Sequence, residues 1–146
     1  MIYRLNNEFE KESAKTAFEM YCKNGNVIEL GKKNFNRTLN QNAYLHLILG
    51  WFAYNYGERL EYVKHEIYKK QVNPDLYVCM YANRVTGELR EDIKSSRDLS
   101  IEDMRISIER FRNFSAKEAG IYLPSSNEHK QLAEIYIEIE RNKQWI

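Results

Sequence analysis

The 146-residue sequence contains only two cysteines and two prolines. Cys22 and Cys79 show no paired spacing, so they predict neither a disulfide framework nor a cysteine zinc site, and we expect free, buried thiols. The apolar run at residues 45–54 is shorter than the roughly 20 residues that a membrane span requires. The first residues turn acidic before any apolar run, so we expect no signal peptide. These absences together predict a cytoplasmic protein with no membrane contact.

The sequence also lacks the motifs of several enzyme classes. It contains no glycine-rich phosphate loop and no Gly-x-Ser-x-Gly nucleophile turn. His65 and Glu66 begin like the helix motif of zinc peptidases, but Lys69 stands where the second histidine must be, and a cation cannot ligate zinc. We therefore predict no catalytic residue, no metal site and no cofactor.

Three carboxylates leave one enzymatic alternative open. Glu88, Glu91 and Asp92 are oxygen ligands of the kind that Mg²⁺ prefers, and metal sites of this kind cleave phosphodiesters. A magnesium-dependent DNA nuclease is therefore the alternative function. Basic residues interleave with the carboxylates, which favours a solvated charged face instead: Arg84, Arg90 and Lys94.

Length and composition indicate one globular domain over residues 1–146. Apolar residues make up 43% of the chain and charged residues 29%, which is typical of folded proteins. Eleven residues are tyrosines, which suggests half-buried surfaces, interfaces or stacking platforms as well as a core. The net charge is only +1, yet residues 31–70 carry seven basic and three acidic side chains. A local basic excess of this kind favours phosphate binding.

Hydrophobic periodicity predicts an α+β fold dominated by helix, with about five helices in a single domain and a small β-hairpin or sheet. A strand is expected to begin at residues 27–30 and run into a basic loop, and a hairpin is expected over 76–94 around Thr86 and Gly87. Thr38 and Gln41 have the spacing of a capping box, which predicts a helix beginning at Thr38. The helices are expected over residues 8–24, 38–57, about 60–71, 100–120 and from about 127.

Residues 32–42 are the most distinctive segment, because cations, an aromatic ring and amide side chains lead into a helix. Helix N-termini present free NH groups and a positive dipole end, and both suit phosphate. Basic side chains can neutralise phosphates, and an exposed ring offers a face on which an unpaired base can stack. We therefore predict a single-stranded DNA-binding site formed by Lys32, Lys33, Phe35, Arg37, Gln41 and Asn42.

The motifs of this sequence resemble those of the NinB (Orf-type) recombination proteins of phages and related prophage proteins. The match begins with Arg-Thr-x-x-Gln-Asn at 37–42 and continues with Gly57 and the helix motif at 63–67. It then includes a serine-rich turn with Leu-Ser at 95–100 and Gly-Ile-x-x-Pro at 120–124, followed by Asn127 and Glu128. The resemblance spans roughly residues 27–128, so the C-terminal helix at 129–146 lies outside it. His46 departs from the family, where a large aromatic residue is common.

The resemblance implies a non-enzymatic, homodimeric protein that binds single-stranded DNA and assists phage homologous recombination in a bacterial host. Such a protein would help to load a recombinase onto strands coated by the host single-strand-binding protein. A protein-interaction adaptor, in which tyrosine-rich helices contact partner proteins, is a further alternative. The DNA preference, the recombinase and the geometry of the dimer do not follow from the sequence.

Overall fold

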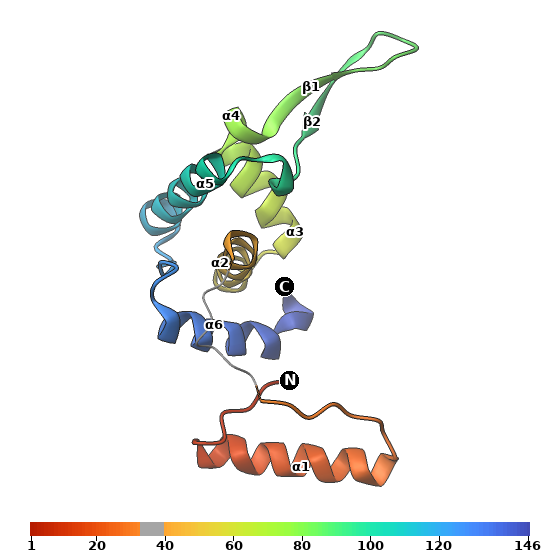
Figure 1. Ribbon diagram of the computed structural model, residues 1–146, viewed down its shortest axis with the longest axis vertical. Coiled ribbons are helices and arrows are strands. Elements are labelled where there is room, and N and C mark those ends of the chain that lie inside the picture. Colours follow the sequence, from red (N-terminus) through yellow and green to blue (C-terminus); the bar gives the residue numbers. More distant parts are fainter. Residues whose placement is uncertain (33–39) are drawn as a thin grey trace.

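In the computed structural model of the protein, residues 1–32 and 40–146 are described. Over these ranges the chain forms a helix-dominated α+β fold with a two-stranded antiparallel sheet, which confirms the predicted fold class (Figure 1). The α-helices are α1 (Glu8–Asn24), α2 (Gln41–Tyr56), α3 (Leu60–Tyr62), α4 (Pro74–Tyr77), α5 (Ile101–Phe114) and α6 (His129–Arg141). The strands are β1 (Val78–Ala82) and β2 (Leu89–Ile93). None of the described helices is long and apolar enough to cross a bilayer.

Two of the helices change pitch before they end. α3 continues as a π-helix, η1 (Val63–Val72), and α5 continues as η3 (Ser115–Ala119). Short 3₁₀ turns, η2 (Ser96–Asp98) and η4 (Lys143–Trp145), precede α5 and follow α6. α3 and η1 together therefore form the predicted helix near residues 60–71.

Local sequence signals set most helix ends. The Ser100 hydroxyl accepts a 3.1 Å hydrogen bond from the backbone NH of Asp103 and caps α5, as the sequence predicts. Gly57 ends α2 with a φ of 83°, a left-handed conformation that costs glycine little because it has no Cβ. The predicted ends of α1 and α2 at Gly25 and Gly57 are confirmed.

α2 lies at the centre of the fold, between α5 and η1 on one side and α6 on the other (Figure 1). It is buried on several faces, because both flanking layers pack against it. Phe52, for example, contacts the ring of Phe111 on α5, with 5.1 Å between ring centroids. The core that results includes Leu45, Ile48, Phe52, Val63, Tyr68, Phe111, Leu132 and Ile135.

Two elements extend away from this core in opposite directions (Figure 1). α1 lies at one end and is tied to α6 by the ion pair of Glu10 with Arg141, and Arg4, which also pairs with Glu10, pairs with Glu138 on α6 at 3.3 Å. The β1–β2 hairpin projects from the other end, in the register that pairs Val78 with Ile93 and Ala82 with Leu89. The predicted hairpin is therefore confirmed.

Three details of the sequence prediction are wrong. Residues 27–30 form no strand, because Val27 and Leu30 stay exposed and, within residues 1–32 and 40–146, no strand lies alongside to supply backbone partners. α2 begins at Gln41 rather than at Thr38, and its N-cap is Asn40. Both cysteines are free, as expected, but neither is buried. Cys22 lies on α1 and Cys79 on the hairpin, and both elements extend away from the core.

Candidate nucleic-acid interface

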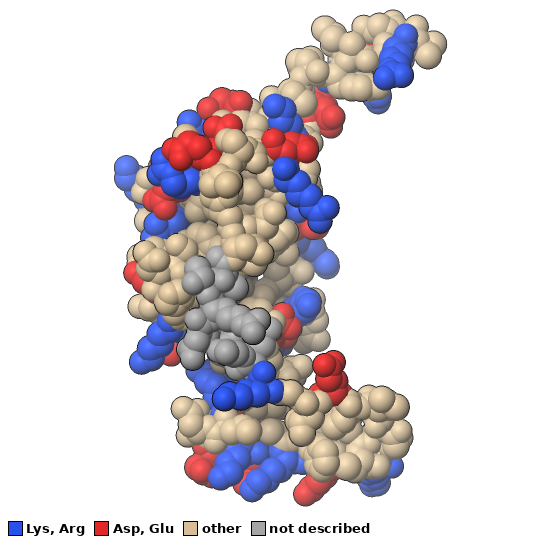
Figure 2. Space-filling view, viewed as in Figure 1, with Lys and Arg blue, Asp and Glu red and all other residues tan. Residues whose placement is uncertain are grey.

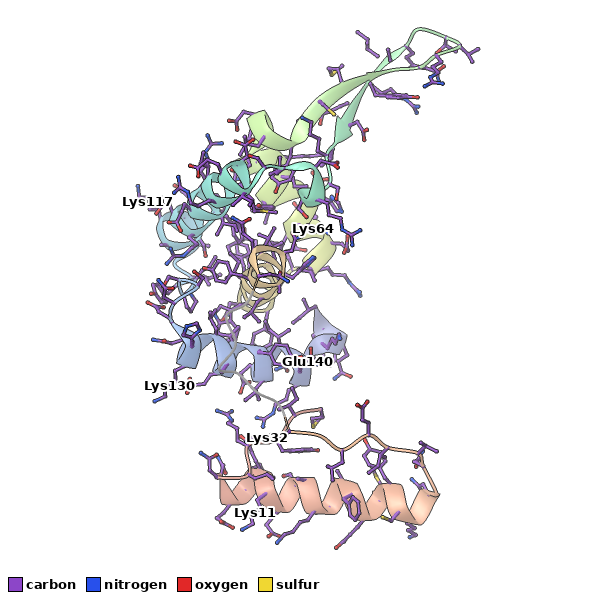
Figure 3. All side chains as sticks on the ribbon, viewed as in Figure 1. Lys11, Lys32, Lys64, Lys117, Lys130 and Glu140 are labelled. Carbon is purple, nitrogen blue, oxygen red and sulfur yellow. The ribbon has the colours of Figure 1, made fainter. Side chains whose placement is uncertain are left out.

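The predicted DNA-binding residues are only partly within the described ranges. Lys33, Phe35 and Arg37 lie outside the described residues. Lys32 is exposed at the end of the segment that follows α1, and it lies between α1 and α6 in the view of Figure 3. Gln41 and Asn42 form the first turn of α2. The structure therefore describes three of the six predicted residues, Lys32, Gln41 and Asn42.

The start of α2 is fixed by two amide side chains. The Asn40 side-chain oxygen accepts a 2.8 Å hydrogen bond from the backbone NH of Ala43, which caps the helix. The Gln41 amide nitrogen donates a 3.0 Å hydrogen bond to the backbone oxygen of Ile101, at the start of α5. Gln41 thus joins two helix N-termini, and Thr38, its partner in the predicted capping box, lies outside the described residues. Asn42 is exposed.

The exposed stripe of α2 that begins at Asn42 continues to His46, one helical turn further on. Burial and then the neighbouring Lys64 ammonium lower the pKa of His46, while the Glu61 carboxylate opposes them. This stripe therefore lies near Lys64 on η1, and the lowered pKa favours the neutral form of His46. Lys64 is labelled beside α3 in Figure 3, well apart from Lys32.

A buried lysine connects η1 to the base of the hairpin. The Lys69 ammonium is only 3% exposed, and it donates a 2.8 Å hydrogen bond to the backbone oxygen of Lys94. Burial and then the Lys64 charge lower the pKa of Lys69, whereas Glu61 and Asp98 oppose them. Lys64, Lys94 and Asp98 therefore all lie near the ammonium group of Lys69.

Basic side chains on α1, α5 and the end of α6 mostly pair with carboxylates, whereas most of those from Arg59 to η2 do not. On α1, α5 and the end of α6, most of them form ion pairs with nearby carboxylates, as Arg110 does with Asp75 at 2.7 Å. Between α3 and η2, one lysine forms an ion pair with a carboxylate, Lys70 with Glu66 at 3.0 Å. Apart from the buried Lys69, the cations from Arg59 to η2 that have no described carboxylate partner are termed the unpaired cations: Arg59, Lys64, Arg84, Arg90, Lys94 and Arg97.

Local geometry explains why nearby carboxylates do not pair with these cations. Glu61 contacts His65 at 3.2 Å, and so it does not pair with Lys64. A side-chain oxygen of Asp92 accepts a 2.9 Å hydrogen bond from the backbone NH of Ile93. Figure 2 shows the result: basic side chains occur on the projecting hairpin and along the edge of the body below it, with acidic ones between them.

The carboxylates of the nuclease alternative do not form a cluster. Glu91 and Asp92 are neighbours in β2, so their side chains point to opposite faces of the hairpin. Glu88 precedes β2 at the end of the turn. Within residues 1–32 and 40–146, no three carboxylate, histidine or cysteine side chains come together as a metal site needs.

Sequence reasoning missed Lys64, Lys94 and Arg97 as members of one surface. The sequence did indicate a basic excess around Lys64, but it assigned the cations near the hairpin to a solvated face. Their common location depends on the contact between Lys69 and the base of the hairpin, which joins segments 25 residues apart. No local spacing rule predicts that contact.

A separate cleft lies between α2, α6 and residues 120–124. It has a volume of ≈ 510 Å³, and Trp51 and Tyr122 contribute aromatic walls. Glu134 and Glu138 also line it, and although Arg4 pairs with Glu138 at 3.3 Å, the second carboxylate leaves the cleft without the positive charge that a phosphate requires. The cleft therefore suits a protein segment better than a nucleic-acid strand.

No protein-family model matches this chain, and searches of curated proteins and of solved structures found no match. The resemblance to the NinB family therefore stays a prediction that depends on the sequence motifs. The function has to be argued from the chemistry of the surface itself.

Proposed function

We propose that the protein binds single-stranded DNA as a non-enzymatic accessory of phage homologous recombination in the cytoplasm of a bacterial host. The observation that carries this proposal is the concentration of unpaired cations between α3 and η2. Cations without carboxylate partners are available to neutralise phosphates, and each contact releases counterions from the strand. Asn42 and His46 lead from the start of α2 toward Lys64, and the predicted basic segment at residues 32–37 precedes α2 in the sequence.

The biological role in this proposal comes from the sequence resemblance. The protein acts as a homodimer and helps to load a recombinase onto strands that the host single-strand-binding protein coats. No step of this role requires a metal, a cofactor or a catalytic residue of this chain. Binding to phosphates and to unpaired bases is sufficient.

Salt titration of a fluorescently labelled oligothymidine tests the proposal. Each phosphate contact on a single strand contributes about 0.7 to the slope of log affinity against log salt. We therefore expect the triple variant Lys64→Gln, Lys94→Gln and Arg97→Gln to bind more weakly, with a slope smaller by about 2.

A matched control changes the same number of charges elsewhere. Lys23, Lys117 and Lys130 are exposed and form no ion pair with a described carboxylate, and Figure 3 shows the latter two on the side away from Lys64. The triple glutamine variant at these three positions should retain the wild-type slope. Equal losses in both variants, or no binding by the wild type at low salt, would contradict the proposal.

The predicted segment before α2 needs its own variant. Lys33→Ala combined with Arg37→Ala should weaken binding to the oligothymidine, and retained affinity would remove these residues from the site. The same oligonucleotide should stay intact with Mg²⁺ or Mn²⁺. Cleavage that disappears in Glu91→Ala would establish the nuclease alternative instead.

The cleft beside Trp51 favours the adaptor as a second candidate function. Aromatic walls with carboxylates on the rim are suited to a peptide that carries basic and apolar side chains. A pull-down of host single-strand-binding protein after nuclease digestion tests it. Capture that survives digestion and is lost in Trp51→Ala supports the adaptor, and capture that requires DNA supports the leading proposal.

A further inference from the structure

The two faces of the β1–β2 hairpin differ in chemistry. Tyr81 pairs directly with Arg90 across the two strands, so both side chains project from the same face. Met80, Ala82 and Leu89 are the strand neighbours of Tyr81 and Arg90, so they project from the opposite face, which is mainly apolar. One face of the hairpin thus presents an aromatic ring and a guanidinium group side by side.

Tyr81 differs from most other exposed tyrosines in having no described partner. Tyr81 is 48% exposed, and among the described residues its ring stacks on no other ring and its hydroxyl forms no hydrogen bond. By contrast, Tyr56 stacks on Phe52 with 5.1 Å between ring centroids, and the Tyr122 hydroxyl donates to Glu128 at 2.6 Å. An exposed, unengaged ring beside an unpaired guanidinium has no role in the stability of the core.

The hairpin holds this pair in a fixed position. At its base, the backbone NH of Lys94 donates a 2.8 Å hydrogen bond to the oxygen of Tyr77, whose side chain is fully buried. At its tip, the Asn83 side-chain oxygen accepts hydrogen bonds from the backbone NH groups of Val85 and Thr86 at 2.8 and 3.0 Å. The anchored base and the closed turn keep the two strands paired, so Tyr81 and Arg90 stay in register before a ligand binds.

We propose that this face of the hairpin binds one nucleotide of a single strand, with the base stacked on Tyr81 and a phosphate paired with Arg90. Opposed residues in an antiparallel pair have Cβ atoms about 5 Å apart, so one nucleotide can reach both groups. Stacking requires an unpaired base, which selects single strands over a duplex. The inference rests on the proposed function, and it adds base stacking to a surface otherwise defined by phosphate contacts.

Oligonucleotide affinity separates the ring from the charge. Tyr81→Ala should lower the affinity for oligothymidine about tenfold with no change in the salt slope, because the lost contact is uncharged. Tyr81→Phe retains the ring and should bind like the wild type. Arg90→Gln should lower both the affinity and the slope, the latter by about 0.7. Tyr21→Ala removes a similarly exposed ring on α1 and should change neither.

Photocrosslinking locates the contact independently of affinity. An oligonucleotide that contains 5-iododeoxyuridine should crosslink to the tryptic peptide 71–84, which contains Tyr77 and Tyr81. Because Tyr77 is fully buried, the crosslink should map to Tyr81 and be lost in Tyr81→Ala. A duplex of the same sequence should crosslink poorly and compete poorly.

The outcomes distinguish the two proposals. If the wild type binds single strands but Tyr81→Ala binds equally well and no crosslink maps to Tyr81, the stacking inference is wrong and the proposed function stands. A duplex that binds as tightly as the single strand would also overturn the stacking inference. If the wild type binds no single strand at low salt, both proposals are wrong.

Discussion

The ammonium group of Lys69, on η1, donates a 2.8 Å hydrogen bond to the backbone oxygen of Lys94, at the base of the hairpin. Lys69 also lies over the ring of Tyr77, 5.2 Å from its centroid. No described carboxylate forms an ion pair with this buried cation, although Glu61 and Asp98 influence its pKa. The interaction joins the helical core to the hairpin without neutralising the charge.

The exchange of Lys69 for methionine should therefore cost little stability at pH 7. Removing a buried charge relieves its desolvation, which offsets the lost hydrogen bond, so we expect a change within about 1 kcal/mol. The pKa of Lys69 is lowered in the folded state, so the unfolded chain binds this proton more tightly. Stability of the wild type relative to Lys69→Met should rise as the pH increases through the folded pKa toward 10.5.

Urea denaturation of both proteins between pH 7 and 10.5 measures this difference. Lys117→Met removes the same charge at an exposed position and should run parallel to the wild type. A constant difference between wild type and Lys69→Met across this range would show that burial does not perturb Lys69.

Tyr44 should make the protein less stable at alkaline pH. Its hydroxyl donates a 2.5 Å hydrogen bond to the backbone oxygen of Pro124, and burial raises the pKa of Tyr44 to about 12. The unfolded chain therefore loses this proton first as the pH rises above 10, and folding stability falls. Tyr44→Phe should cost about 1 kcal/mol at pH 8. That difference should shrink between pH 10 and 12, and chemical denaturation that shows it unchanged would contradict the assigned pKa.

Gly50 and Ile139 set how closely α2 and α6 approach. A Cβ atom added to Gly50 would lie 3.3 Å from the Cδ1 atom of Ile139. Gly50→Ala gains about 1 kcal/mol of helix propensity but displaces that methyl group, so we expect a net change near zero. Gly50→Val overpacks the contact and should destabilise the protein by roughly 1–3 kcal/mol.

A double-mutant cycle tests this approach directly. Ile139→Val removes the Cδ1 atom, and alone it should cost about 1 kcal/mol. Combined with Gly50→Ala it should be more stable than the sum of the two single changes predicts. Strict additivity in thermal or urea denaturation would show that these residues do not touch.

Local rules predicted where helices begin and end better than they predicted which elements pack against one another. The Ser100 cap and the Gly57 helix end depend on neighbouring backbone groups alone, and both are confirmed. Periodicity predicted α1, but the structure leaves its apolar residue Phe9 exposed, because periodicity does not say what covers a face. Residues 27–30 have the composition of a strand, yet a strand also needs a neighbour, and no described strand lies beside them.

In the candidate site too, local sequence indicated some residues, and only the fold brings the others together. The sequence predicted the cations that precede α2 because they are contiguous, and for Lys33 and Arg37, which lie outside the described residues, this stays a prediction. It did not locate the surface that includes Lys64 and Lys94, because their proximity follows from the fold around Lys69. Gln41 shows a third case, because its tertiary hydrogen bond to the backbone oxygen of Ile101 follows from the fold and from no local motif.

Gln41 and Asn42 are adjacent members of the predicted DNA site, and their variants should behave differently. Gln41→Ala removes the hydrogen bond to the backbone oxygen of Ile101, so it should lower the free energy of unfolding by about 0.5–1 kcal/mol. Asn42 is exposed, so Asn42→Ala should stay within about 0.5 kcal/mol of the wild type. Because its side chain faces solvent beside His46, Asn42→Ala should weaken oligothymidine binding while leaving stability intact. Urea denaturation and anisotropy on the same two variants measure both effects. Weaker binding by Gln41→Ala alone, in step with its lost stability, would remove Asn42 from the site and assign Gln41 a structural role.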